Sequence, residues 1–111
     1  MPVLIEVSVA GEARKGGVPE AELEGFVRRC AALEGLRVEG LMAVMPQTED
    51  PEDIRPYFRR MRAWFERLRD AQIENTDIST LSMGMSNDCI VAAEEGATMV
   101  RLGRSLFGER A

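Results

Sequence analysis

The order of short apolar runs and amphipathic helices constrains this chain more than any other feature. Four runs of aliphatic or small residues alternate with segments of helical periodicity, and a glycine or a polar loop follows each run. Strands that alternate with helices of this size pair in parallel through right-handed crossovers. The sequence therefore predicts an α/β fold of four consecutive βα units. Four parallel strands could form a small open sheet, but the small-residue or polar loop at the C-terminal end of each strand favours half of a (β/α)8 TIM-type barrel. The expected strands are Val3–Val9, Gly40–Met45, Thr80–Met83 and Met99–Leu102.

Helices are expected between these strands. The first two carry apolar stripes, with Leu23, Phe26, Val27, Cys30 and Leu33 on one and Ile54, Phe58, Met61, Phe65 and Leu68 on the other. The third follows a Ser-Asn-Asp sequence that is typical of a helix cap. Asn75–Thr80 is expected to break the chain before the third strand. The expected helical segments are Pro19–Leu33, Pro51–Gln72, Cys89–Glu95 and a last turn at Gly103–Phe107.

Composition excludes several classes of function. The chain has 111 residues, a net charge of −5 and no histidine, so it lacks the cationic field that attracts nucleic acid or an anionic membrane. Transition-metal ligation and histidine catalysis are not expected. Cys30 and Cys89 are expected to be small buried groups in a reducing compartment. Without a signal peptide or an apolar span, the expected location is the cytoplasm.

Two glycine-containing strand ends predict an anion site. Leu81–Asp88 runs from a strand through Gly84 to a helix start, where free amides and the hydroxyls of Ser82 and Ser86 can bind an anion. Gly103 and Arg104 follow the next strand in a similar arrangement. Neighbouring loops of a parallel barrel converge, so the sequence predicts one phosphate site. An ordinary serine-capped helix without a ligand is the alternative.

Arg101 alternates with Val100 and Leu102, so its side chain is expected on the opposite face of the strand, toward the inside of a barrel. A buried guanidinium needs an anion or an acceptor. The functional hypothesis is contact with a bound cofactor. The alternative is an ion pair with a neighbouring carboxylate such as Glu6. The arginines of the second helix are instead expected to form a solvated face, because acidic residues are interleaved with them.

The string LSMGMSNDCIVAAEEGATMVRLGRSLFGER resembles the C-terminal signature of the pyridoxal phosphate homeostasis proteins. VLIEVSVAGEARKGGV and GLRVEGLMAVMP resemble the two preceding strand segments of that family, in the same order and at similar spacing. The resemblance covers essentially the whole chain. It implies a barrel like the N-terminal domain of alanine racemase and pyridoxal 5'-phosphate as the cofactor.

The same resemblance implies roles for individual residues. Ser86 and the amides of Gly103 and Arg104 would hold the cofactor phosphate, with Ser82 beside them. Arg101 would approach the pyridine nitrogen and disfavour the protonated ring, which weakens its power as an electron sink. Arg104 stands where family members often have a small hydroxyl residue. The resemblance implies no catalytic or metal-binding residue here.

The resemblance also implies that residues 1–111 correspond to the C-terminal half of the barrel domain. In the family, a lysine on an early strand holds the cofactor covalently, and no counterpart of that strand is present here. Lys15 is the one lysine of the chain and lies in the loop after the first strand. It is expected to be solvated, with a secondary, reversible aldehyde site as the alternative.

Three functions remain open from the sequence. The favoured one is a pyridoxal phosphate carrier, and not an enzyme. The second is a fragment of a racemase-like pyridoxal phosphate enzyme, and the third is a half-barrel with a structural or assembly role. A half-barrel leaves strand edges unpaired, so a homodimer or pairing with the other half-barrel is expected.

Overall fold

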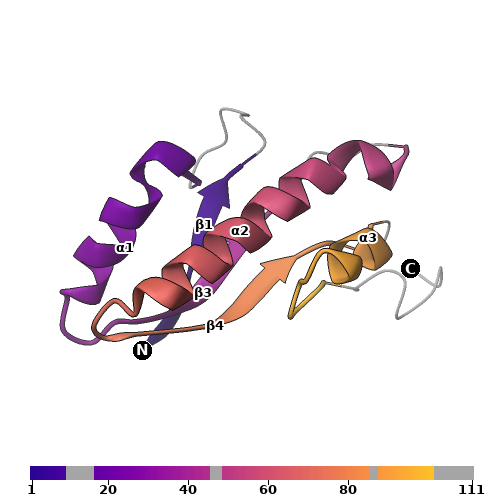
Figure 1. The fold of residues 1–111 in the computed structure, drawn as a ribbon. Coiled ribbons are helices and arrows are strands. Elements are labelled where there is room, and N and C mark those ends of the chain that lie inside the picture. The colour runs from indigo at the N-terminus through magenta and orange to yellow at the C-terminus, as the bar shows by residue number, and fades with distance from the viewer. Residues whose placement is uncertain (10–16, 46–48, 86–87, 102–111) are drawn as a thin grey trace.

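The computed structural model describes residues 1–9, 17–45, 49–85 and 88–101. It contains a parallel four-stranded sheet in the order β2-β1-β3-β4, with α1 and α2 lying across one face (Figure 1). The predicted α/β class with parallel strands is confirmed. The strands are β1 (Pro2–Ser8), β2 (Val18–Pro19), β3 (Arg37–Ala43) and β4 (Thr76–Met83), and the helices are α1 (Leu23–Ala31), α2 (Arg55–Ala71) and α3 (Cys89–Glu94), with 3-10 turns η1 (Glu20–Glu22) and η2 (Pro51–Ile54).

The hydrophobic core fills the space between the sheet and helices α1 and α2. Alternate strand residues such as Val7, Leu41 and Leu81 point into it, and Phe58 and Met61 of α2 pack against them. Ile54, Phe65 and Leu68 are buried as well, so the apolar stripe predicted for the second helix is confirmed. The stripe of α1 is shorter than predicted, because Leu33 lies beyond the helix and is exposed.

The side chains that alternate with the core residues point to the other side of the sheet, which we call the open face. In this group Ser82 is buried, and Leu4, Glu6, Met42 and Thr80 are half-buried. Glu6, Met42 and Ser82 lie in one row across three neighbouring strands, because their Cα atoms are register partners. Leu4 and Thr80 lie in the next row, on either side of Gly40. The open face therefore mixes apolar, polar and charged side chains.

Gly40 marks an irregularity in the sheet. The register of β3 shifts at this residue against both β1 and β4. A Cβ atom at Gly40 would lie 1.8 Å from the backbone oxygen of Thr80, far inside contact distance. The sequence prediction began the second strand at Gly40, and this start is wrong: Arg37 and Val38 already pair with Pro2 and Val3.

The third strand also begins earlier than predicted. Asn75–Thr80 was expected to separate the second helix from this strand, yet β4 starts at Thr76, which pairs with Val38. The break is therefore much shorter than the prediction. It is made by Gln72 and Asn75, which both have positive φ angles, 51° and 67°. Asn75 is held by its side-chain amide, which donates to the carbonyl oxygens of Ala31 and Leu36.

The start of the first helix differs from the prediction as well. Pro19 was expected to open the helix, but it is extended, with φ −60° and ψ 146°. Val18 and Pro19 instead form β2 and pair with Val7 and Ser8 of β1. Proline lacks an N–H group, so it is compatible with the edge of a sheet. The regular helix begins four residues later, at Leu23.

The predicted fourth strand, Met99–Leu102, is represented by a single parallel bridge between Met99 and Ser82. Val100 and Arg101 are not assigned to a strand, and Leu102 lies outside the described residues. The last helical turn predicted at Gly103–Phe107 lies outside them too. Within the described ranges the fourth βα unit is therefore limited to the approach of this segment to β4.

Candidate functional site

The segment Met99–Arg101 lies beside the end of β4, as the sequence predicted for these two neighbouring strands. The backbone N–H of Met83 donates to the carbonyl oxygen of Met99 at 3.0 Å, and the N–H of Arg101 donates to that of Gly84 at 3.0 Å. These bonds continue the parallel bridge between Ser82 and Met99. The segment that carries Arg101 is thereby fixed against the end of β4.

The guanidinium of Arg101 is held at two of its nitrogens. Nη1 donates to Oγ of Ser82 at 2.8 Å, and Nη2 donates to the carbonyl oxygen of Ala43 at 2.8 Å. The side chain therefore reaches past β4 to the end of β3, on the open face, as its alternation with Val100 predicted. The alternative of an ion pair with Glu6 is wrong for the described residues, in which no carboxylate pairs with Arg101.

Arginine carries five N–H donors and remains charged throughout the physiological range. The bonds to Ser82 and Ala43 use two of them, so three remain among the residues that the structure describes. This set of donors on a fixed, half-buried cation suits an anion or a neutral acceptor such as a ring nitrogen. The sequence predicted such a donor, although not the partners that hold it.

The turn after β4 is closed by Asp88. Gly84 has φ 103°, and a Cβ atom there would lie 2.5 Å from that of Ala92, so the turn requires glycine in order to bring α3 close. Oδ1 of Asp88 accepts from the N–H of Met85 at 2.6 Å. Asp88 is 6% exposed and is the N-cap residue of α3, but its side chain makes no capping bond. The sequence identified the turn and missed this role of Asp88.

Three of the five predicted cofactor-binding residues, Ser86, Gly103 and Arg104, lie outside the described residues, and so does Lys15. Their roles stay predictions. Ser82 and Arg101 are described, and the structure brings them into direct contact. The candidate site in the described region therefore consists of Arg101, the side chain and carbonyl that hold it, and the turn that begins at Gly84.

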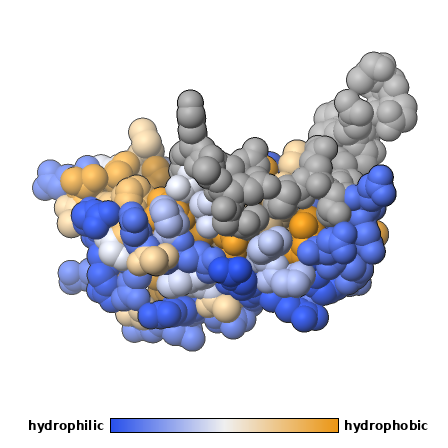
Figure 2. Space-filling model, turned by 90° about the horizontal axis from the view of Figure 1, so that it is seen from above, coloured by the Kyte–Doolittle hydropathy of each residue, from blue (hydrophilic) through white to orange (hydrophobic). Residues whose placement is uncertain are grey.

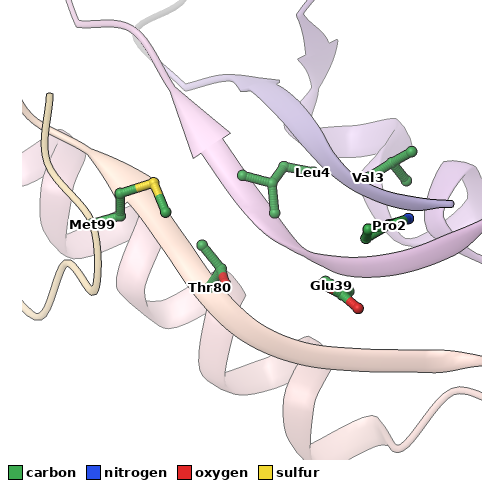
Figure 3. Close-up of a pocket in the computed structure, with 6 residues that line it drawn as sticks. All are labelled: Pro2, Val3, Leu4, Glu39, Thr80 and Met99. Atoms are coloured by element: carbon green, nitrogen blue, oxygen red, sulfur yellow. The ribbon is translucent and has the colours of Figure 1, made fainter.

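A hollow of about 220 Å³ lies elsewhere on the sheet. Leu4, Glu39, Thr80 and Met99 line it together with Pro2 and Val3, and their side chains surround it in Figure 3. Gly40 separates Leu4 from Thr80 in their row and contributes no side chain, which leaves this space between them. The hollow is lined by the first residues of β1, whereas Arg101 binds at the last residues of β3 and β4.

The charged residues of α2 form ion pairs on the outer surface. Arg55 donates to Glu52, Glu94 and Glu95, with bonds of 2.6 to 2.8 Å, and so joins η2 and α2 to α3. Its hydrogen bonds lower the pKa of both Glu52 and Glu95 below the usual value and raise the pKa of Arg55 itself. Hydrophilic side chains dominate much of the surface seen from above (Figure 2). The solvated arginine face predicted for this helix is confirmed for Arg59, Arg60, Arg67 and Arg69, whose side chains are 47–65% exposed. It is wrong for Arg55, which is 18% exposed because three carboxylates surround it.

Other kinds of site find little support. In the described ranges, no three histidine, cysteine, aspartate or glutamate side chains are grouped so as to hold a metal ion. Cys30 and Cys89 are not joined in a disulfide and are of intermediate burial, not the fully buried groups that were expected. Among the helices that the structure describes, none is long and apolar enough to cross a membrane.

The parallel sheet with helices on one face, and with a fixed arginine at the strand ends, is the arrangement of the class of β/α-barrel proteins. The chain belongs to the family of the alanine racemase N-terminal domain, whose model matches residues 1–111. Its relatives include pyridoxal phosphate homeostasis proteins. That of Aquifex aeolicus is 49% identical and covers 97% of this chain, and that of Escherichia coli K12 is 39% identical and also covers 97%.

Solved structures agree with this assignment. PipY of Synechococcus elongatus without PLP superimposes with a TM-score of 0.84 at 29% identity over 96% of this chain, and the form with PLP bound gives 0.79 at 28%. In both cases the match covers 49% of the PipY chain. It covers 46% of the Aquifex relative. The chain thus spans about half the length of the proteins that it matches.

Proposed function

We propose that this chain is the C-terminal half of a pyridoxal phosphate-binding β/α barrel that carries the cofactor in the cytoplasm and is not itself an enzyme. The fixed guanidinium of Arg101 is the observation that carries the proposal, because it offers donors on the open face that no described residue uses. The names of the relatives and the PLP bound to PipY support the choice of ligand. The half-barrel assignment is supported by the coverage, because this chain matches 46% of the Aquifex relative and 49% of PipY.

The residues present fit this cofactor. Pyridoxal phosphate supplies an aldehyde and a pyridine ring that withdraws electrons when its nitrogen is protonated. Arg101 stays charged and can only donate, so a ring nitrogen beside it acts as an acceptor and remains unprotonated. Such a ring withdraws electrons weakly, which suits a carrier more than a catalyst.

The cofactor phosphate is proposed to bind at Ser86 and the amides of Gly103 and Arg104. The support is the contact between the two chain segments that lead to these residues, since Arg101 is bonded to Gly84. Asp88 already occupies the N–H of Met85, so the phosphate is expected to use the amides beyond that residue. Inorganic phosphate should therefore compete with the cofactor.

Equilibrium dialysis with pyridoxal phosphate tests the function. Arg101→Ala should weaken binding by tenfold or more, since it removes a charge-assisted contact of about 1.5–3 kcal/mol. Arg69→Ala is the matched control, because Arg69 lies on the exposed face of α2 and pairs with Asp70. Borohydride trapping of the wild type and of Lys15→Ala measures any covalent attachment at Lys15. Equal binding by wild type and Arg101→Ala would remove the basis of the proposal.

Completion of the barrel is the second part of the proposal. The open face carries half-buried Leu4 and Met42, and Met99 beside it is 50% exposed, so we expect either a homodimer or pairing with the complementary half-barrel. Light scattering at micromolar concentration measures the mass in solution. A compact monomer that still binds the cofactor would contradict this part and leave the cofactor assignment intact.

A further inference from the structure

The contact between Ser82 and Arg101 joins a buried hydroxyl to a cation. Ser82 is 3% exposed, and its neighbours Leu81 and Met83 belong to the core on the other side of the sheet. Its hydroxyl therefore lies on the open face, where its oxygen accepts from Nη1 of Arg101 at 2.8 Å. A buried hydroxyl in a strand is costly unless it has a partner, and this one bonds a cation.

The carbonyl oxygen of Ala43 completes the arrangement. It accepts from Nη2 of the same guanidinium at 2.8 Å, and Ala43 is the register partner of Met83, the residue after Ser82. Two bonds to the two terminal nitrogens fix both the position and the plane of a guanidinium. With Ser82 removed, one bond remains and the group can turn about it. The carbonyl belongs to the backbone, so Ser82 is the part that a side-chain change can remove.

Ser82 also has a hydroxyl hydrogen that no described residue accepts. A hydroxyl that accepts from a guanidinium directs its own hydrogen elsewhere, and in the region that the structure describes this hydrogen has no acceptor. A nearly buried O–H beside a cation with three spare donors points to a ligand with acceptor atoms at this place. The hydrogens of both residues are available to that ligand.

We propose that Ser82 is a positioning residue that holds Arg101 in the orientation needed to donate to the ring nitrogen of the cofactor. The sequence had grouped Ser82 with the phosphate-binding residues; here it acts through Arg101. This inference rests on the proposed function. Its distinctive consequence is electronic: loss of Ser82 changes the state of the ring nitrogen and not only the affinity.

The first test needs no cofactor. Nitrogen-15 NMR of the free protein measures rotation of the Arg101 guanidinium about its Cζ–Nε bond, which is slow when both terminal nitrogens are bonded. Ser82→Ala should accelerate this rotation several-fold, and Ser82→Thr, which keeps the hydroxyl, should restore slow rotation. Ser82→Cys has nearly the size of serine but is a weak acceptor, so it should behave like Ser82→Ala. Unchanged rotation in Ser82→Ala would overturn the inference.

The second test uses pyridoxal phosphate labelled with nitrogen-15 in the ring. The bound wild type should show an unprotonated ring nitrogen that accepts a hydrogen bond, and Ser82→Ala should lose that signature and bind about tenfold more weakly. Ser79→Ala is the matched control, because Ser79 is an exposed serine on the same strand and bonds Asp77. A variant Ser82→Ala with wild-type ring shift and affinity overturns this inference alone, whereas a wild type that binds no cofactor overturns the proposed function with it.

Discussion

The two faces of the sheet are formed by the same strands but differ in the side chains that they carry. On the helix-covered face, apolar residues of β1, β3 and β4 enter a core closed by α1 and α2. On the open face, the row of Glu6, Met42 and Ser82 combines a carboxylate, a thioether and a hydroxyl. The first face is organised by burial, and the second by a hydrogen-bonded arginine. Stability and ligand binding should therefore respond to different substitutions.

The largest difference in stability between the two faces is expected when Phe58→Ala in the core is compared with Met42→Ala on the open face. Phe58 is 0% exposed in the core, and such a truncation lowers the free energy of unfolding by about 3–5 kcal/mol. Met42→Ala on the open face is the control and should cost clearly less, because Met42 is only half-buried. Urea denaturation of both variants measures the difference. Equal losses would show that the two faces are packed to the same degree.

Gly40→Ala tests the backbone that both faces share. The added methyl would lie 1.8 Å from the Thr80 oxygen, so the strands must move apart at a cost of about 3 kcal/mol. Gly35→Ala is the matched control: Gly35 has φ 89° and open space around it, so it should lose only about 1–2 kcal/mol from backbone strain. Thermal unfolding ranks the two variants, and a milder effect at Gly40 would contradict the close approach.

Asp88→Ala removes the acceptor that closes the turn at the end of β4. The N–H of Met85 then loses its 2.6 Å bond to the buried carboxylate, and the free energy of unfolding should fall by about 1.5–3 kcal/mol. Asp88→Asn keeps an acceptor oxygen and should lie between this variant and the wild type. Denaturation of the three proteins under the same conditions measures the order. If Asp88→Asn is as damaged as Asp88→Ala, the charge matters more than the bond.

The smallest effect is expected from acid. Hydrogen bonds from Arg55 lower the pKa of Glu52 and Glu95 below the usual 4.5, so their pairing stabilises the fold above that value and is lost as the pH falls through the lowered pKa. Arg55→Gln should therefore be less stable than the wild type at neutral pH, and this difference in stability should shrink at lower pH. Urea midpoints from pH 7 down to about 3 measure this. Arg101 is bonded to a hydroxyl and a carbonyl, which do not titrate here. Any difference in urea midpoint between Arg101→Ala and the wild type should therefore stay constant over the same pH range.

The elements predicted most accurately from the sequence were those with a clear local pattern of apolar residues. The stripe from Ile54 to Leu68 placed α2 because its apolar residues recur at helical spacing. The start of β4 was missed because Asn75 and Asp77 read as turn residues, while the pairing of Thr76 with Val38 depends on a strand far away in the chain. Pro19 likewise read as a helix start, although its pairing with Ser8 decides its conformation.

The candidate site divides in the same way. The face on which Arg101 lies, and its need for an acceptor, followed from its alternation with apolar neighbours. Its bond to Ala43 did not, since a backbone carbonyl 58 residues away carries no sequence signal. Asp88 read as a helix cap, and only the fold shows that it binds Met85 instead.

The irregularity at Gly40 has a consequence for the curvature of the molecule. Val3, Val38 and Thr76 are register partners and form one row across the sheet; Leu4, Gly40 and Thr80 form the next row. From the first row to the second, β1 advances by one residue, β3 by two and β4 by four. The rows therefore run obliquely to the strand direction. An oblique offset of this kind is the stagger that lets a sheet tilt and close on itself, so part of the geometry of closure is already present within these three strands.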